Sequence, residues 1–392
     1  MLKIKNGKLV TDKLEEKNLY IENGKIVNIT EEDLPCDSEL DAKGCYVSAG
    51  FIDTHVHGGG GHEFMDGGVE PMRLAAKTHL KYGTTSICPT SVASTDDVLK
   101  EMVLDYKELV KESGKNGLPN FVGMHLEGPY FSPREAGAQP PQCIYPPNPK
   151  QYNEVIAMAE GHIAKWSFAP ELEGAVEFCD TLAKNNIIPS IGHTAGTYED
   201  VLRVYEHGAK CLTHFYSSMT TITRRNGYRI LGVVEAGYLL DDLYIEVIAD
   251  GSHLPPELLK MICKNRGIDR IHLITDGMRG VDMPDGETMI GRIGQGQPAI
   301  IEDGIAKVLD RSCFAGSVAT SDRLVRTMVK KVGFSVVDAV GLITKCPAEL
   351  LGLKTKGRIE VGFDADIAIF DEAITVKAVL VGGNIIHNNI YR

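Results

Sequence analysis

Two histidines separated by one residue, His55 and His57, are the first side chains in this sequence whose spacing could do chemistry. His55 lies near the end of the apolar run 51–56, and His57 follows that run directly. We expect the run to form a buried strand because it contains β-branched and aromatic residues. Side chains alternate between the two faces of a strand, so both imidazoles point the same way. Such a pair supplies half of a metal site, and four glycines follow at 58–61. A His-x-His pair alone is more often incidental, so the rest of the chain must support the metal interpretation.

Further residues of metal-ligand type stand at the ends of other apolar runs. Glu127, His193, His214 and Asp276 lie at such ends, and His253 lies just past one. If the strands surround a closed barrel, these ends meet at one mouth. Imidazoles and carboxylates without thiolates form a site that suits Zn²⁺ or Fe²⁺. The alternative is that each is an ordinary polar residue with a hydrogen bond, which would require several independent coincidences.

The elements that must position these residues alternate between strand and helix over about 300 residues. Most gaps between the apolar runs carry a helical pattern, and eight strands alternating with helices predict a (β/α)₈ barrel. A doubly wound open sheet is the main alternative, but no Gly-x-Gly-x-x-Gly opens a helix after the first strand. The eight runs are 51–56, 84–89, 121–127, 165–170, 187–193, 211–215, 244–250 and 271–276.

Two long loops interrupt this alternation. Residues 129–149 are rich in proline and follow the third predicted strand, and residues 277–316 follow the eighth. Loops of this length are usually functional or disordered. Because both follow the carboxyl ends of strands, where barrel enzymes carry their sites, we expect them to be lids.

Both chain ends read as short strands joined by tight turns. Asn-Gly pairs at 6–7 and 23–24 mark hairpins near the start, and a Gly-Gly pair at 382–383 marks one near the end. Neither piece can bury a core by itself. We therefore predict a small β-sandwich built from residues 1–48 and 351–392, beside a metal-dependent barrel formed by 49–350.

Composition narrows the partners and the compartment. The 392-residue chain has a net charge of −12, so we expect neither a nucleic acid nor an anionic membrane as a partner. No apolar run approaches a membrane span, and the first residues lack the apolar core of a signal peptide. The nine cysteines are scattered without any Cys-x-x-Cys, which fits a reducing environment. We expect a cytoplasmic protein.

Several motifs together resemble the N-acetylglucosamine-6-phosphate deacetylase family of the amidohydrolase superfamily. The most specific is His-Leu-Glu-Gly-Pro at 125–129, whereas the His-x-His pair and Thr-Asp-Gly at 275–277 belong to the wider superfamily. The resemblance covers nearly the whole chain. Its other carriers are segments 50–58, 192–194, 213–214, 249–253, 346–353, 357–359 and 362–366.

The resemblance implies a metal centre. Glu127, His193 and His214 would hold the principal divalent ion, Zn²⁺ or Fe²⁺. His55 and His57, together with Glu127, would hold a second ion. Some relatives lack this histidine pair and work with one metal, so one or two ions per subunit remain open.

The resemblance also implies the remaining roles. Asp276 would be the general base and acid and a further candidate ligand of the second ion, and His253 would contact the substrate. Arg225 falls where the family places an arginine that reaches the sugar phosphate, often across a dimer interface. This implies a homodimer. The alternative for Arg225 is a solvated or ion-paired surface residue, and for Asp276 a helix N-cap.

The implied reaction is hydrolysis of the acetamide of N-acetylglucosamine 6-phosphate to glucosamine 6-phosphate and acetate. Ser217 and Ser218 stand where the family usually has Asn-Ala, a pair that helps anchor the sugar phosphate. Gln139 stands where many relatives have a substrate-binding histidine. These departures leave room for N-acetylgalactosamine 6-phosphate or another N-acyl substrate on the same metal centre. A non-catalytic sugar-phosphate sensor is disfavoured, because a sensor does not need a full ligand set plus Asp276.

Overall fold

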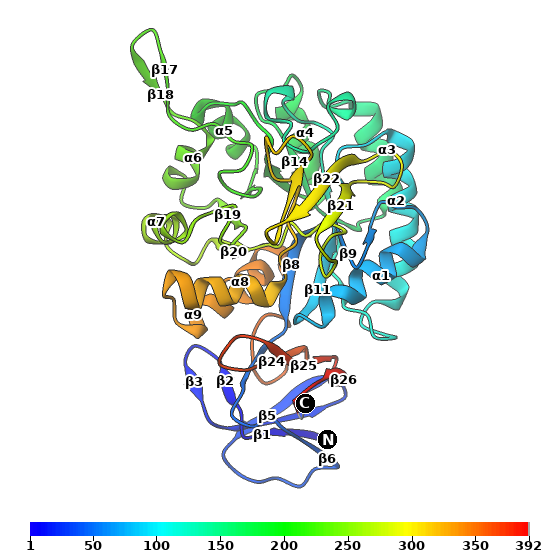
Figure 1. The fold of residues 1–392 in the computed structure, drawn as a ribbon, viewed down its shortest axis with the longest axis vertical. Coiled ribbons are helices and arrows are strands. Elements are labelled where there is room, and N and C mark those ends of the chain that lie inside the picture. The colour runs from blue at the N-terminus through cyan, green and yellow to red at the C-terminus, as the bar shows by residue number, and fades with distance from the viewer. Residues whose placement is uncertain (391–392) are drawn as a thin grey trace.

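The body of the protein is a ring of parallel strands surrounded by helices, in a computed structural model that describes residues 1–390 (Figure 1). One parallel sheet has the order β13-β14-β15-β16-β19-β20, and a second has the order β12-β11-β8. Isolated parallel bridges join the two sheets on both sides, Thr90 with His125 and Val56 with Gly277. This arrangement fits a TIM-type barrel. The strands are β8 (Phe51–Val56), β11 (Thr84–Pro89), β12 (Asn120–Phe121), β13 (Met124–Glu127), β14 (Ile163–Phe168), β15 (Ile188–Ile191), β16 (Cys211–Leu212), β19 (Tyr244–Val247) and β20 (Ile271–Leu273).

Helices cover the outside of the ring, and local sequence explains where some of them begin. α5 begins where Thr197 and Asp200 form a capping box, and α3 begins at Pro149 after the N-cap Asn148. The helices are α1 (Val69–Leu80), α2 (Asp96–Leu109), α3 (Pro149–Ala159), α4 (Ala175–Lys184), α5 (Tyr198–Tyr205), α6 (Val233–Leu239), α7 (Pro256–Arg266), α8 (Ser321–Thr327), α9 (Val336–Gly341) and α10 (Lys345–Leu351). None of the helices formed by residues 1–390 is both long and apolar enough to cross a membrane.

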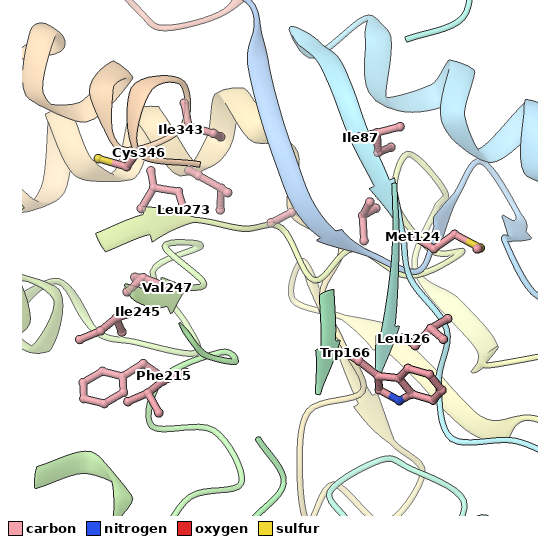
Figure 2. Packing of buried hydrophobic residues seen from close by; sticks show 14 of the residues in the cluster. Ile87, Met124, Leu126, Trp166, Phe215, Ile245, Val247, Leu273, Ile343 and Cys346 are labelled. Atoms are coloured by element: carbon pink, nitrogen blue, oxygen red, sulfur yellow. The ribbon is translucent and has the colours of Figure 1, made fainter. Parts of the chain in front are cut away.

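The barrel strands alternate between apolar outer faces and polar inner faces. On β14, Trp166 and Phe168 pack edge-on against Phe178 of α4, with ring centroids 5.2 and 5.4 Å from it. Figure 2 shows Trp166 among buried apolar residues of the main hydrophobic core. Lys165 and Ser167, which alternate with these aromatic residues along the strand, face inward. Burial of the outer faces drives folding, while the inner faces are left for a site.

Strands from both chain ends lie together below the barrel in Figure 1. β7 pairs antiparallel with β24, so the first and last segments share a sheet. A hydrophobic cluster separate from the barrel core draws on both segments, for example Ile4, Val47 and Ile367. The sheet orders are β5-β4-β1-β6 and β26-β25-β24-β7-β2-β3. Their strands are β1 (Leu2–Lys5), β2 (Lys8–Val10), β3 (Leu14–Glu15), β4 (Asn18–Glu22), β5 (Lys25–Thr30), β6 (Ser38–Asp41), β7 (Tyr46–Ala49), β24 (Ile367–Phe370), β25 (Val376–Val381) and β26 (Asn384–Asn388).

Three small β elements decorate the barrel. β9 (Gly58–Gly59) and β10 (His62–Glu63) follow β8 directly. The hairpin of β17 (Thr223–Arg225) and β18 (Tyr228–Ile230) projects away from the body (Figure 1). The long loop after β20 forms an antiparallel sheet of β21 (Gly286–Ile290), β22 (Gln297–Glu302) and β23 (Ile305–Val308).

Candidate metal centre

A pocket of about 440 Å³ opens at the carboxyl ends of the barrel strands. All of the predicted site residues except His55 and Arg225 line it, and His55 lies fully buried behind His57. Both loops expected to be lids contribute to its wall, through residues 137–139 and through residues between 290 and 316. The members predicted from sequence are His57, Glu127, Gln139, His193, His214, Ser217, Ser218, His253 and Asp276.

Glu127, His193 and His214 converge on one point although they are far apart in the sequence. Glu127 Oε1 lies 3.3 Å from His193 Nε2 and 3.0 Å from His214 Nε2. The two Nε2 atoms lie 3.0 Å apart. These three residues form one of the groups whose donor atoms are close enough to hold a metal ion.

A second group adjoins the first and shares Glu127 with it. His55 Nε2 lies 3.5 Å from Glu127 Oε1, and His57 Nε2 lies 3.5 Å from Glu127 Oε2. The two Nε2 atoms of the pair are 3.3 Å apart. Asp276 Oδ1 completes the group, 3.0 Å from His57 Nε2 and 3.3 Å from His55 Nε2. The carboxylate of Glu127 therefore bridges two sets of imidazoles.

The spacing of these donor atoms fits a bound transition metal. Ligand atoms at about 2.0–2.1 Å from a tetrahedral Zn²⁺ are separated from one another by about 3.3 Å. The separations in both groups, 3.0 to 3.5 Å, bracket that value. Imidazole lone pairs that face each other at such distances repel unless a cation or a proton lies between them. The donor set is thus suited to a divalent ion of borderline hardness.

Three of the site residues turn into the mouth from positions just beyond their strands. The runs 187–193, 211–215 and 271–276 were predicted as strands, but β15, β16 and β20 end at Ile191, Leu212 and Leu273. His193, His214 and Asp276 then adopt left-handed backbone conformations, with φ of 46°, 31° and 52°. This region is unfavourable for most side chains, and such strain is concentrated at functional sites. It aims the side chains into the pocket instead of across the sheet.

Burial and mutual charge set the protonation of the ligand-type groups. Burial opposes ionisation of Glu127, but the neighbouring imidazoles of His55, His193 and His214 outweigh it and hold the pKa of this carboxyl well below its usual range. Burial, reinforced by His125, lowers the pKa of His55 well below its ordinary value. The pKa of His57 rises to about 9, because Asp276 and Glu127 together outweigh the effect of burial.

Hydrogen bonds from outside the groups fix two of the ligand-type side chains. His193 Nδ1 lies 2.9 Å from the carbonyl oxygen of Glu135, which leaves Nε2 facing Glu127. Gln139 accepts a hydrogen bond from the backbone N–H of Ala93 at 2.7 Å and donates one to Glu127 Oε2 at 2.5 Å. Partners of this kind hold metal ligands in the orientation that binding requires.

The predicted substrate residues divide into two sets. Ser217, Ser218 and His253 line the pocket beside the ligand groups. His253 Nδ1 lies 2.9 Å from Asp250 Oδ2, and its ring packs 4.5 Å from that of Phe314. Arg225, by contrast, is not one of the described residues that line this pocket. It lies exposed on the projecting β17–β18 hairpin (Figure 1).

Sequence reasoning missed two cations in the pocket wall. The pocket lining formed by residues 1–390 includes one lysine, Lys307, and one arginine, Arg311. Both contact Glu302: Lys307 Nζ and Arg311 Nε lie 3.0 and 2.9 Å from Oε1, and Arg311 Nη2 lies 2.9 Å from Oε2. Arg311 and Lys307 lower the pKa of Glu302 to about 2. The only signal in the sequence was their place in a long loop after the last barrel strand.

A third group, Cys211, Glu246 and His272, has donor atoms as close together as those of the first two. It lies deep in the barrel interior, and the ammonium of Lys165 contacts Glu246 Oε1 there. A buried cation that already contacts this carboxylate competes directly with a metal ion. The two groups at the mouth are therefore better suited to a metal ion than this third group.

The chain is similar in sequence and fold to proteins of one enzyme family. The model of the Amidohydrolase family matches residues 46–386. An N-acetylglucosamine-6-phosphate deacetylase of Bacillus subtilis (strain 168) is 30% identical, over 98% of this chain and 96% of that protein. An N-acetylgalactosamine-6-phosphate deacetylase of Escherichia coli O157:H7 is 29% identical, over 95% of each. A variant N-acetyl-D-glucosamine-6-phosphate deacetylase from Mycobacterium smegmatis, solved in complex with N-acetyl-D-glucosamine-6-phosphate, superposes with a TM-score of 0.89 over 99% of both chains at 27% identity.

Proposed function

The chain belongs to the amidohydrolase family, and from this premise we propose that it hydrolyses the acetamide of N-acetylglucosamine 6-phosphate to glucosamine 6-phosphate and acetate. Relatives with that activity in their names match nearly the full length of the chain. The observation that carries the proposal is the convergence of Glu127, His193 and His214 within 3.0 to 3.3 Å of one another at the barrel mouth.

We assign a principal divalent ion, zinc or iron, to Glu127, His193 and His214. A second ion would be held by His55 and His57 together with the shared Glu127, and Asp276 is a further candidate ligand. The donor separations and the full burial of these side chains support both assignments. When bound, such an ion polarises a carbonyl group and makes water a stronger acid.

Asp276 is the group that moves the proton in this proposal. Its carboxylate lies beside the His55 and His57 imidazoles and lines the pocket, so it can reach both an attacking water and a bound acetamide. It accepts the proton of the water and then delivers it to the departing amine, which must leave protonated. Such transfers typically contribute about 10²–10⁴-fold to a rate.

The side chains lining the pocket would hold the sugar. We propose that Gln139, Ser217, Ser218 and His253 contact the substrate. Asp250 fixes the ring of His253 through Nδ1, so Nε2 is free to face a ligand. Gln139 is braced by Ala93 and Glu127, so it can couple the position of the substrate to that of the ligand group.

We further propose a homodimer in which Arg225 reaches the sugar phosphate in the neighbouring subunit. The projection of its hairpin from the body of the subunit supports this role. Replacement of Arg225 by alanine should raise KM for the phosphorylated substrate by about tenfold, since a charge-assisted hydrogen bond contributes roughly 1.5–3 kcal/mol. Turnover of unphosphorylated N-acetylglucosamine should not change. Steady-state kinetics with both sugars tests whether Arg225 contacts the phosphate. An equal loss of kcat/KM for both sugars would contradict this role.

Lys307 and Arg311 are candidates for a phosphate contact within the same subunit. Glu302 braces both cations at the pocket wall, and a dianionic substrate needs a local basic patch on a chain of net charge −12. Arg311→Gln should raise KM for the phosphorylated sugar by about fivefold to tenfold and leave kcat unchanged. Arg203→Gln is the matched control, because Arg203 is as exposed (51% against 52%) and also pairs with a carboxylate, but outside the pocket. An equal change of KM in both variants would exclude a phosphate contact.

N-acetylgalactosamine 6-phosphate is the second candidate substrate, favoured by the relative of that name and by Ser217 and Ser218 in the pocket wall. Acetate release should be measured with both N-acetylated sugar phosphates and with their unphosphorylated forms. Greatest kcat/KM for N-acetylglucosamine 6-phosphate supports the proposal, and greatest kcat/KM for the galactose isomer favours the second candidate. A metal-loaded protein that binds these sugars without releasing acetate would support the sensor instead.

The organisation of the chain forms part of the proposal. We infer a catalytic barrel from residues 49–350 and a β-sandwich from 1–48 and 351–392, supported by the β7–β24 pairing and by the separate terminal hydrophobic cluster. All nine cysteines are free thiols, which supports a cytoplasmic protein.

A further inference from the structure

A buried ion pair lies beneath the two ligand groups, inside the barrel. Lys165 of β14 and Glu246 of β19 contact each other through Nζ and Oε1, and both are fully buried. Barrel interiors are usually filled by branched apolar side chains. Desolvating two charges costs several kcal/mol per ion, and apolar residues of similar volume are often at least as stable. Stability alone therefore gives no reason for this pair.

The carboxylate of Glu246 touches a residue from each ligand group. Oε2 lies 3.0 Å from His55 Nδ1, and the same oxygen accepts a hydrogen bond from the backbone N–H of His214 at 3.2 Å. The backbone carbonyl of Glu246 also accepts a hydrogen bond from Phe215 at 2.8 Å. A single residue thus holds the ring of His55 and the backbone turn that presents His214.

The contact with Glu246 selects the tautomer of His55. An ionised carboxylate only accepts, so Nδ1 of His55 carries the hydrogen and Nε2 keeps its lone pair. That Nε2 atom faces His57 and Glu127, at 3.3 and 3.5 Å. The Nδ1 atoms of His57 and His214 find no hydrogen-bond partner within residues 1–390. Among the histidines of the second group, the orientation of His55 is therefore the one fixed from behind.

We propose that Glu246, neutralised by Lys165, is a positioning residue that aligns His55 and His214 around the shared carboxylate of Glu127. This inference rests on the proposed function, because it requires the two groups to hold metal. A carboxylate behind a metal-binding histidine fixes the ring and raises its basicity, and its loss typically weakens metal affinity by about 10–100-fold. Removal of the Glu246 carboxylate should weaken the second ion most, since that ion depends on the ring of His55.

Two paired substitutions separate this role from a purely structural one. Lys165→Met with Glu246→Leu removes both charges and the acceptor for His55. Lys165→Met with Glu246→Gln also removes both charges, but the glutamine oxygen still accepts from His55 Nδ1. Metal-free protein is titrated with Zn²⁺ against a chromogenic chelator to give the number of ions and each Kd. Thermal unfolding of the same metal-free samples records the fold.

The leucine pair should weaken the second zinc ion by about 10–100-fold, and the glutamine pair should restore Kd to within a few-fold of wild type. The glutamine pair should unfold near the wild-type temperature, since removing both charges leaves no unpaired buried charge. The leucine pair should fold but unfold at a lower temperature, since the His55 Nδ1–H and the His214 backbone N–H lose their acceptor. Ser190→Ala is the control, because its interior hydroxyl contacts Thr213 and a carbonyl oxygen instead of Glu246.

Equal zinc affinities in the two paired variants would overturn the positioning role. If the leucine pair does not fold, Glu246→Asp decides, because it keeps the negative charge that balances Lys165 but shortens the side chain by one methylene group, which moves the carboxylate away from His55. Wild-type zinc affinity in that variant would also overturn the role. If the wild-type protein binds no zinc, the proposed function is overturned. If the wild-type protein and all variants bind zinc with the same affinity, only the role of Glu246 is overturned.

Discussion

Replacement of Asp276 by asparagine is expected to lower kcat by at least about 10²-fold while leaving metal binding largely in place. Asparagine cannot take up the proton of a water molecule, and proton transfer contributes about 10²–10⁴-fold. The backbone should not change, because asparagine tolerates the left-handed conformation that Asp276 adopts at φ 52°. The measurement is kcat for acetate release, together with metal per subunit by elemental analysis.

Asp282→Asn is the matched control for this substitution. Asp282 lies in the same loop and also has a left-handed backbone, at φ 65°, but its carboxylate pairs with Lys81 and Tyr82 at the surface. This variant should keep the wild-type kcat. Near-normal turnover in Asp276→Asn with intact metal content would refute the assignment of Asp276 as base and acid.

Glu127→Gln is expected to have the largest effect of any single change, because Glu127 contributes an oxygen to both ligand groups. Glutamine retains the size of the side chain but not its negative charge, and its amide nitrogen cannot bind a metal. We expect loss of both ions and a fall of kcat/KM by about 10³-fold or more, since Lewis-acid stabilisation amounts to several kcal/mol and each 1.36 kcal/mol is tenfold. Elemental analysis and steady-state kinetics measure the two effects.

A buried carboxylate outside the pocket provides the control for Glu127. Glu63 is 1% exposed, like Glu127, and it contacts the backbone N–H groups of Arg279 and Gly291. Glu63→Gln should retain both ions. Wild-type metal content in Glu127→Gln would mean that the ions bind at a place other than the two groups that contain Glu127.

The barrel and most of its mouth could be predicted because the signals are local. Helix ends follow from capping residues such as Thr197 and Pro149, which act within a few residues. Apolar runs mark the strands, and parallel strands in a barrel must bring their carboxyl ends together. His55, His57 and Glu127 could therefore be placed at one mouth without any knowledge of distances.

What sequence reasoning missed depends on contacts between distant segments. Glu246 lies within an apolar run, and nothing local indicates that it reaches His55, which is 191 residues away. Strand lengths were overestimated at His193, His214 and Asp276, because the left-handed turns that aim these side chains are fixed by packing at the mouth. The hairpin that carries Arg225 has a local signal, the Asn226-Gly227 turn between its two strands, but no local pattern indicates that it projects from the body.

The most direct test of this account is the anomalous scattering of crystals grown with Zn²⁺ and measured at the zinc edge. We predict a strong peak within about 2.0–2.2 Å of Glu127, His193 and His214, the distance of zinc–ligand bonds. A second, weaker peak is expected among His55, His57 and the same Glu127 carboxylate. A map from zinc-saturated crystals with no peak among Glu127, His193 and His214 would contradict the account.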